Sequence, residues 1–321
     1  MGVGKAVAHS NIALAKYWGK ADTVRNLTAV PSLSLTLAAL RTETTVRFDE
    51  SLAADELELG GVSVAGRPLL RVSKLLDTVR AQVGLSTRAR VESVNDFPTA
   101  AGLASSASGF AALAMAAVRA AGLELSRAEI SAIARAGSAS AARSLFGGYV
   151  SLGARAESAE RVAEGGDFPL EMLVAVTVAG EKETASTDGM GHTQGTSPYY
   201  AAWVEAAPAI YERVRAAVLA ADFEALGPAV EHSALAMHAS MLAAQPALIY
   251  FAPGTLGVME RVRAFRKSGG RAYFTMDAGP HVKVLVEPSA AAELEQELAK
   301  LPGVTQVLRS AAGPDAYWVD P

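Results

Sequence analysis

A loop of small residues ahead of a long apolar stretch is the first segment suited to chemistry. It runs from Pro98 to Ala107, and the residues expected to contact a ligand are Pro98, Gly102, Leu103, Ala104, Ser105 and Ser106. Free backbone N–H groups and the positive end of the helix dipole bind phosphate at such a helix start. The serines add hydroxyl donors, and Ser105 is the candidate magnesium ligand. An ordinary capped helix with tightly packed small residues is the alternative.

Two charged residues further along the chain could act on an anionic substrate. Asp277 ends an expected strand beside a Gly-Pro turn, where a carboxylate is held rigidly and can serve as an acid or base; a turn-capping aspartate is the less favoured alternative. Arg143 lies among small residues and presents a planar fork to a carboxylate or phosphate. Ser138 and Ser140 would offer hydroxyls to the same anion, unless they bond to their own backbone.

A compact basic cluster lies near the N-terminus. Lys16 and Lys20 are four residues apart and flank Tyr17 and Trp18. A solvated basic helix turn is the ordinary explanation of this spacing. Like charges beside two aromatic rings also favour a pocket for an anion, and that reading requires the cluster to meet the other candidate residues in space.

Four segments in the same order resemble the GHMP kinase superfamily and, within it, the diphosphomevalonate decarboxylase family. The wording NDFPTAAGLASSA is similar to the phosphate-binding motif of that family. The other matches are Asn11 to Lys20 with NIAxxKYWGK, Gly137 to Gly148 with GSGSACRSLxGG, Met276 to Pro280 with MDAGP, and more loosely Gly189-Met190 followed by Thr196-Ser197. They extend from position 11 to the region of position 281, so the resemblance covers most of the chain.

The resemblance implies a function and a role for each candidate residue. ATP, with Mg²⁺, would phosphorylate the tertiary 3-hydroxyl of mevalonate 5-diphosphate, and loss of phosphate and carbon dioxide would give isopentenyl diphosphate in isoprenoid biosynthesis. Asp277 would act on the 3-hydroxyl as base or orienting group, and Arg143 and Lys16 would complete the catalytic set. The family further assigns Lys16, Tyr17 and Lys20 to the diphosphate, Asn11, Ser138, Ser140, Arg143 and Ser197 to the substrate, and Ser93 to the neighbourhood of the adenine.

Several positions depart from the family pattern. Val30-Pro31-Ser32 stands where Asn-Ser-Ser is common, Ala139 and Ala142 replace Gly and Cys, and Pro198 follows Ser197 where some members carry Arg. These changes leave the choice among mevalonate, its monophosphate and its diphosphate open. A kinase that stops at phosphorylation, a phosphomevalonate decarboxylase and a non-catalytic nucleotide-binding relative are the rival hypotheses.

The bulk composition limits the classes of function. The chain has 321 residues, 50% hydrophobic and 19% charged, which is typical of a globular protein. It contains no cysteine, which excludes disulfides and thiolate chemistry. A net charge of −4 argues against a nucleic-acid binder, and because Met1 to Ala8 lack the apolar core of a signal peptide we do not expect secretion. The five scattered histidines do not predict a metal site. We expect a cytoplasmic enzyme with a small-molecule substrate and no membrane segment, and the family suggests a homodimer.

The elements expected to position these residues form two lobes of an α+β fold. Strands are expected at 32–37, 44–49, 57–64 and 89–94, followed by a buried helix from Ser105 to Ala121. Ser126 and Glu129 predict a capping box that opens a second helix, which Gly147 and Gly148 end. We expect a linker over 154–167, an N-terminal lobe over 1–167 and a C-terminal lobe over 168–321, with strands and helices interleaved in the latter. The resemblance implies a ribosomal protein S5 domain 2-like first lobe and a ferredoxin-like α/β sandwich as the second.

Overall fold

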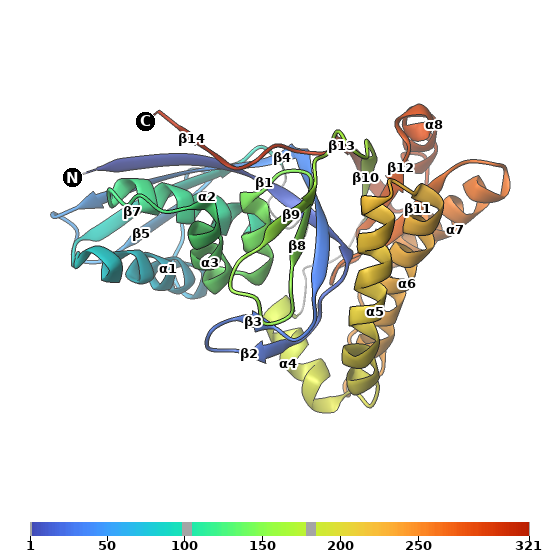
Figure 1. The fold of residues 1–321 in the computed structure, drawn as a ribbon, viewed down its shortest axis with the longest axis horizontal. Coiled ribbons are helices and arrows are strands. Elements are labelled where there is room, and N and C mark those ends of the chain that lie inside the picture. Colours follow the sequence, from blue (N-terminus) through green and yellow to red (C-terminus); the bar gives the residue numbers. More distant parts are fainter. Residues whose placement is uncertain (1, 98–104, 178–183, 321) are drawn as a thin grey trace.

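The computed structural model describes residues 2–97, 105–177 and 184–320, which form two lobes joined along a common seam (Figure 1). The first lobe is built on an eight-stranded sheet in the order β14-β1-β4-β7-β5-β6, with β8 paired to β4 and β9 to β8. Its strands are β1 (Val3–Ala15), β4 (Ser32–Asp49), β5 (Glu56–Leu59), β6 (Val62–Ser63), β7 (Arg88–Asn95), β8 (Tyr149–Leu152), β9 (Glu160–Ala163) and β14 (Tyr317–Val319). A separate hairpin pairs β2 (Lys20–Asp22) with β3 (Leu27–Thr28).

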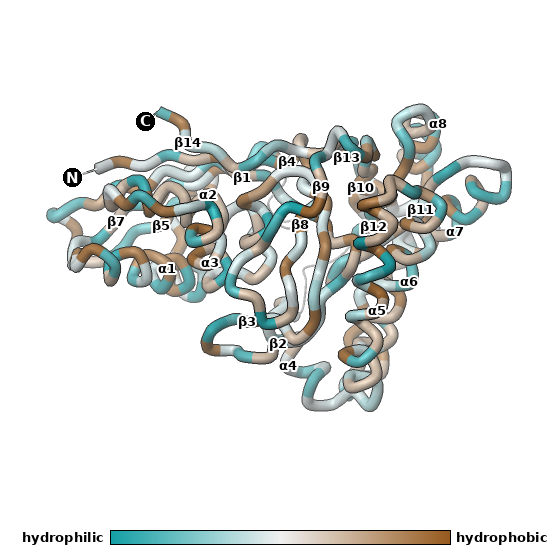
Figure 2. The backbone as a smooth tube through the Cα atoms, viewed as in Figure 1, coloured by the Kyte–Doolittle hydropathy of each residue, from teal (hydrophilic) through white to brown (hydrophobic). Residues whose placement is uncertain are grey.

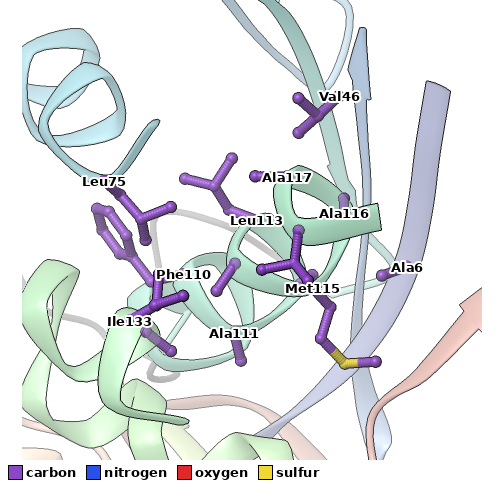
Figure 3. Packing of buried hydrophobic residues seen from close by; sticks show 14 of the residues in the cluster. Ala6, Val46, Leu75, Phe110, Ala111, Leu113, Met115, Ala116, Ala117 and Ile133 are labelled. Carbon is purple, nitrogen blue, oxygen red and sulfur yellow. The ribbon is translucent and has the colours of Figure 1, made fainter. Parts of the chain in front are cut away.

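Helices cover one face of this sheet. They are α1 (Arg67–Val83), α2 (Ser105–Ala120), α3 (Arg127–Gly137) and the 3-10 helix η2 (Ala139–Leu145). Figure 3 shows Leu75 of α1 and Ile133 of α3 beside Phe110 of α2. Gly4 lets β1 approach α2 closely, since a Cβ on Gly4 would lie 2.0 Å from the Ala116 carbonyl oxygen. Figure 2 shows hydrophobic residues recurring along α1, which is the pattern of a helix with one buried side.

The second lobe is an antiparallel sheet in the order β11-β12-β10-β13 with helices on both faces. Its elements are β10 (Glu171–Thr177), α4 (Ser186–Thr196), α5 (Tyr200–Leu219), α6 (Phe223–Leu242), α7 (Pro253–Lys267), β11 (Ala272–Met276), β12 (Val282–Val286), α8 (Pro288–Leu298) and β13 (Val304–Ala311). Alternate residues of each strand face α7 and α8, and the intervening residues face α5, α6 and the first lobe. This mixed architecture confirms the predicted α+β class.

The capping box is confirmed. The Ser126 hydroxyl accepts a hydrogen bond from Glu129 N at 3.3 Å, and the Glu129 carboxylate accepts one from Ser126 N at 2.8 Å. The helix that follows is shorter than predicted, because α3 ends at Gly137 and Ser138 is extended (φ −158°) before η2 begins. A Cβ on Gly137 would collide with the Phe110 ring at 2.4 Å, so this close helix crossing requires a glycine.

Other sequence-based predictions need correction. Residues 32–49 form one long strand rather than two, and the expected linker contains β9, which pairs with β8. β1 was not predicted, because its residues alternate weakly and both of its faces are buried. The last strand, β14, pairs with β1 and so returns to the first lobe, which the predicted boundary at 167/168 did not anticipate. The boundary itself stays a prediction.

Within the described ranges, no helix is both long and apolar enough to cross a membrane.

Candidate active site

The turn between β11 and β12 holds Asp277 in a fixed position. The Asp277 carbonyl accepts a hydrogen bond from Gly279 N at 2.8 Å, which tightens the turn. The hydroxyls of Thr177 and Thr255 both donate to the Pro280 carbonyl, at 3.1 and 2.6 Å. These bonds tie the turn to β10 and α7, and the carboxylate lies against Lys16 of the first lobe in a cavity lined by both lobes.

Two ammonium groups hold the Asp277 carboxylate. Lys16 Nζ lies 2.6 Å from Oδ1, and Lys283 Nζ lies 3.3 Å from Oδ2. Burial alone would raise the pKa of the Asp277 carboxyl, but the two cations outweigh it and hold this pKa well below its usual range. Burial lowers the pKa of Lys16 to about 8, against the opposing attraction of Asp277. The aspartate is therefore ionised at neutral pH, and Lys16 loses its proton under mildly basic conditions.

Arg143 is buried on η2, with 1% of its surface exposed, and its guanidinium contacts neutral acceptors. It donates from Nε to Ser34 Oγ at 2.9 Å, from Nη1 to Ser32 Oγ at 2.6 Å and from Nη2 to Asn11 Oδ1 at 3.2 Å. No carboxylate of the described residues forms an ion pair with it. Burial lowers the pKa of the Arg143 guanidinium. A buried cation with only neutral partners is suited to binding an anion.

Asn11 organises the wall beside Arg143. Its side-chain amide donates to the Ser140 carbonyl at 3.0 Å and to Ser144 Oγ at 2.7 Å, while its oxygen accepts from Arg143. Ser138 and Ser140 lie with their hydroxyl oxygens 3.2 Å apart. The predicted serines and Arg143 thus belong to one wall, and Asn11 fixes the orientation of the guanidinium.

A cavity of about 240 Å³ brings residues of both lobes together. Those predicted from the sequence that line it are Asn11, Lys16, Tyr17, Ser105, Ser106, Ser140, Arg143 and Asp277. Tyr17 lies between the charges, with the Arg143 guanidinium 5.7 Å from its ring centroid, and burial raises the pKa of its phenol. The anion-pocket interpretation of the Lys16 cluster therefore agrees with the structure, whereas the solvated helix turn does not: Lys16 follows the end of a strand and is 2% exposed.

A larger cavity of about 610 Å³ adjoins the first and shares Tyr17, Ser106 and Ser140 with it. It is strongly basic, being lined by Lys20, Arg67, Arg71 and Lys74, together with Ser138. Burial lowers the pKa of the Lys20 ammonium, and the nearby Arg71 lowers it further. Arg67 forms a bidentate pair with Asp188 of α4, at 2.8 Å for both contacts. The two cavities together suit a molecule with several negative charges.

Sequence reasoning missed three of these cations. Arg67, Arg71 and Lys74 are spaced four and three residues apart, which places them on one face of α1. That spacing is readable in the sequence, but the helix carries other charged residues, and nothing local indicates which face borders a cavity. Lys283 was missed as well, within a strand of valines.

A third cavity of about 190 Å³ has an apolar lining beside the start of α2. Leu57, Leu59, Val72, Phe110 and Leu113 form most of its wall, and Ser93, Asn95, Ser105 and Ser106 supply polar groups. The Ser93 hydroxyl is 2.9 Å from that of Thr44. Ser106 borders all three cavities, so a ligand in the third could reach the first. The predicted contacts Pro98, Gly102, Leu103 and Ala104 lie outside the described residues.

Ser197 is placed differently from the expectation. It does not belong to the lining of any of these three cavities, and its hydroxyl donates to the Ser240 carbonyl at 2.6 Å. Ser197 also follows the last turn of α4, where its backbone N–H bonds to Thr193. Here it ties α4 to α6. Val30, which stands where the family commonly has Asn, packs in an apolar cluster and does not line these cavities. Ser32, two residues later, accepts a hydrogen bond from Arg143.

The middle of the Lys16 to Lys20 motif joins the lobes. Trp18 Nε1 donates to Thr193 Oγ1 at 3.0 Å, and Trp203 Nε1 donates to the Trp18 carbonyl at 2.8 Å. Gly19 has φ +111°, and a Cβ there would lie 2.0 Å from the Tyr200 hydroxyl. The tryptophan and glycine thus serve to anchor the segment, and the lysines on either side reach the cavities.

Among the described residues, no group of three or more His, Asp or Glu side chains could hold a metal ion by itself. The Ser105 hydroxyl at the first residue of α2 is an oxygen donor on the cavity wall. This donor set fits Mg²⁺ that arrives with nucleotide phosphates, because Mg²⁺ commonly takes most of its ligands from phosphates and water.

Known proteins share this arrangement over nearly the whole chain. Residues 8–163 match the diphosphomevalonate decarboxylase-like N-terminal domain, and residues 172–313 match the mevalonate 5-diphosphate decarboxylase C-terminal domain. Phosphomevalonate decarboxylase of Haloferax volcanii is 33% identical, covering 96% of this chain and 95% of its own. A solved complex of MDDEF with MVAPP, AMPPCP and magnesium is 42% identical, with a TM-score of 0.94, covering 100% and 99%. Mevalonate diphosphate decarboxylase from Staphylococcus aureus is 37% identical, with a TM-score of 0.94, covering 99% and 98%.

Proposed function

The chain belongs to the diphosphomevalonate decarboxylase family, and on that premise we propose that it decarboxylates mevalonate 5-diphosphate to isopentenyl diphosphate at the expense of ATP. One observation carries the proposal. Asp277 of the second lobe meets Lys16 and Arg143 of the first around a single cavity, with Lys16 Nζ and Asp277 Oδ1 2.6 Å apart. The ionised carboxylate can accept a hydrogen bond from a hydroxyl group, and the buried cations can bind the carboxylate and phosphoryl groups beside it.

In the proposed arrangement ATP occupies the apolar cavity and the start of α2. A flat base fits between Leu57, Phe110 and Leu113, with Ser93 as a polar neighbour. Phosphates then extend past Ser105 and Ser106 toward the first cavity, guided by the positive end of the α2 dipole. Magnesium, with Ser105 as one ligand, would neutralise adjacent phosphate charges.

The proposed reaction has two stages. Asp277 accepts a hydrogen bond from the tertiary 3-hydroxyl and orients its oxygen for in-line attack on the γ-phosphorus. As the new oxygen–phosphorus bond forms, the bond from the γ-phosphorus to the bridging oxygen breaks, ADP leaves with that electron pair, and the hydroxyl proton passes to Asp277. The carbon–oxygen bond of the new 3-phosphate then breaks, and its electron pair departs with phosphate. Electrons of the bond to the carboxylate form the alkene as carbon dioxide is released. Lys16 and Arg143 stabilise the anions, and the buried wall excludes water from the electron-poor carbon.

The basic second cavity supports a substrate with a diphosphate. Lys20, Arg67, Arg71 and Lys74 offer four cations next to the acid-binding cavity, more than one phosphate needs. The alternative is a monophosphate substrate. Two observations favour it: the similarity to phosphomevalonate decarboxylase, and the pairing of Arg67 with Asp188, which removes one cation from the count.

A three-substrate assay tests the proposal. Purified protein with ATP and Mg²⁺ is given mevalonate, its 5-phosphate or its 5-diphosphate, and carbon dioxide and ADP are measured. We expect both products in equal amounts from the diphosphate alone. Carbon dioxide from the monophosphate would favour the alternative, and accumulation of a stable 3-phosphate would make the protein a kinase. Binding of a nucleotide without any ADP release would indicate a non-catalytic relative. The homodimeric state stays a prediction that light scattering can test.

A further inference from the structure

Lys283 is a buried cation that the mechanism above does not use. It is the second residue of β12, with 1% of its surface exposed. Its neighbours Val282 and Val284 face the core under α7 and α8, whereas Lys283 and Leu285 face α6 and the first lobe. Across the sheet Lys283 pairs with Thr275 on β11 and with Val174 on β10. A lysine thus occupies a position where the strand pattern calls for an apolar residue.

Packing and stability do not explain this residue. An ammonium taken out of water loses its hydration, and the described contacts return little: Asp277 Oδ2 and the His281 carbonyl are each 3.3 Å from Nζ. A buried ion pair is often no more stable than hydrophobic residues of similar volume. Asp277 also has a closer cation already, since Lys16 lies at 2.6 Å. The second ammonium must therefore do something that the first cannot.

The two lysines differ in their access to substrate. Lys16 belongs to the lining of the 240 Å³ cavity, and Lys283 does not. They also contact different oxygens, with Lys16 on Oδ1 and Lys283 on Oδ2. When a phosphorylated acid enters, Lys16 can turn toward the new anion and away from Asp277. The cation that then still contacts the Asp277 carboxylate is Lys283, which lies outside the cavity lining, and it would set the protonation state and orientation of that carboxylate.

We propose that Lys283 is a positioning residue: its ammonium stays on Oδ2 and keeps the Asp277 carboxylate ionised and directed at the substrate hydroxyl while Lys16 engages the phosphates. The expected effect of Lys283 on turnover rests on the proposed function. Its expected effect on the protonation of Lys16 rests only on the contacts among Lys16, Asp277 and Lys283. Lys283 acts through Asp277 and touches no reacting atom.

The charges around Asp277 and Lys16 determine the signs of the test. Among the described residues, five other ionisable groups come together around the Asp277 carboxylate. They are Lys16 and Tyr17 in the segment after β1, Lys283 on β12, Arg143 on η2 and His238 on α6. Burial and the nearby Lys16 lower the pKa of His238 to about 4, so this imidazole is neutral in the assay range. Lys283 repels the Lys16 proton and competes for Asp277. Its removal therefore raises the pKa of Lys16 from about 8.

The first experiment compares Lys283→Met with the wild-type enzyme. Met has similar length and no charge, and we expect kcat to fall about 10- to 100-fold, because a small misplacement of a reacting group costs that much, with KM for ATP unchanged. Activity that requires protonated Lys16 is lost as pH rises through its pKa, so the basic limb of kcat/KM should move to higher pH in Lys283→Met. The exposed Lys300→Met is the matched control and should behave as wild type.

A second experiment separates charge from shape. The chain contains no cysteine, so Lys283→Cys introduces the sole thiol. Alkylation with 2-bromoethylamine in denaturant, followed by refolding, restores an ammonium at nearly the lysine position, whereas iodoacetamide adds a neutral group. We expect only the aminoethylated protein to regain kcat, to within about threefold of wild type carried through the same treatment. Equal recovery with both reagents would mean that Lys283 fills space and nothing more.

A third measurement needs no substrate and so separates this inference from the proposed function. The ¹³Cε resonance of Lys16, assigned with Lys16→Gln, is titrated in wild type and in Lys283→Met. We expect a higher midpoint in the variant. An unchanged or lower midpoint, or a kcat within threefold of wild type, overturns the role of Lys283. If wild type releases no carbon dioxide from any mevalonate substrate, the proposed function fails and this titration still decides the inference. Should Lys283→Met not fold, Lys283→Gln serves in its place.

Discussion

Replacing Asp277 with Asn removes the one negative charge among several buried cations. The change conserves shape, but Lys16 and Lys283, with 2% and 1% of their side chains exposed, lose the carboxylate that contacts both. Removing one partner of a fully buried ion pair costs about 3 to 5 kcal/mol of folding free energy. Because the Asp277 side chain is 33% exposed, the cost here lies toward or below the lower end of that range. A positioned acid or base contributes roughly 10² to 10⁴ in rate. We therefore expect turnover to fall by that factor, together with a marked loss of stability at neutral pH.

The loss of stability in Asp277→Asn should itself depend on pH. Asp277 raises the pKa of Lys16 by attraction and hydrogen bonding, so in the variant this pKa falls below its wild-type value of about 8. A lysine whose folded pKa lies below that of the unfolded chain binds fewer protons when folded, and stability then rises with pH between the two values. The destabilisation relative to wild type should be largest near pH 6.5, where wild-type Lys16 is protonated beside its carboxylate and the variant is not stabilised in this way. It should be smaller at pH 9, where Lys16 has lost its proton in most molecules of both proteins.

Denaturant unfolding at both pH values and carbon dioxide release measure the two effects. Asp315→Asn is the matched control, because Asp315 also pairs with two cations, Arg161 and, at 3.6 Å, Arg127, but lies away from the three cavities. It should lose stability and keep its kcat. Turnover within tenfold of wild type in folded Asp277→Asn, or a destabilisation equal at pH 6.5 and 9, would refute the reasoning.

Three further predictions concern the cations of the cavities. Arg143→Lys should lower kcat/KM by about 10²-fold, because a point charge cannot replace three directed hydrogen bonds worth roughly 1 kcal/mol each. Steady-state kinetics measure this ratio, and an unchanged kcat/KM would remove Arg143 from the site. Arg71→Met should raise KM for the diphosphorylated substrate about 10-fold or more and leave the inhibition constant of mevalonate, measured as a competitor of that substrate, unchanged, since only the diphosphate has a phosphate for the basic cavity. Equal effects on both constants would assign Arg71 elsewhere. In wild type, kcat/KM should decline above a pH of about 8 as Lys16 loses its proton; a profile level to pH 10 would show that the charge of Lys16 is not needed.

The sequence carried much of the local structure and most of the candidate residues. The capping box at Ser126 and the helix beginning at Ser105 follow from hydrogen-bonding rules that act over three or four residues. The motifs also marked Asp277, Arg143 and Lys16 before any contact between them was known. Where prediction failed, contacts between distant segments were involved. Gly137, at which α3 ends, packs so closely against the Phe110 ring that no side chain fits there, and β1 is a strand whose sheet neighbours and α2 bury it on both sides.

Residue types and their local spacing thus determined which chemistry was available, and only the tertiary structure decided which charges act together. Lys16 and Asp277 are 261 positions apart and 2.6 Å apart in space. Lys283 and the three cations of α1 looked like ordinary strand and surface residues until their neighbours were known. The physical reason is that the protonation and strength of a charged group depend on the few ångströms around it and on the exclusion of water, and folding alone creates both.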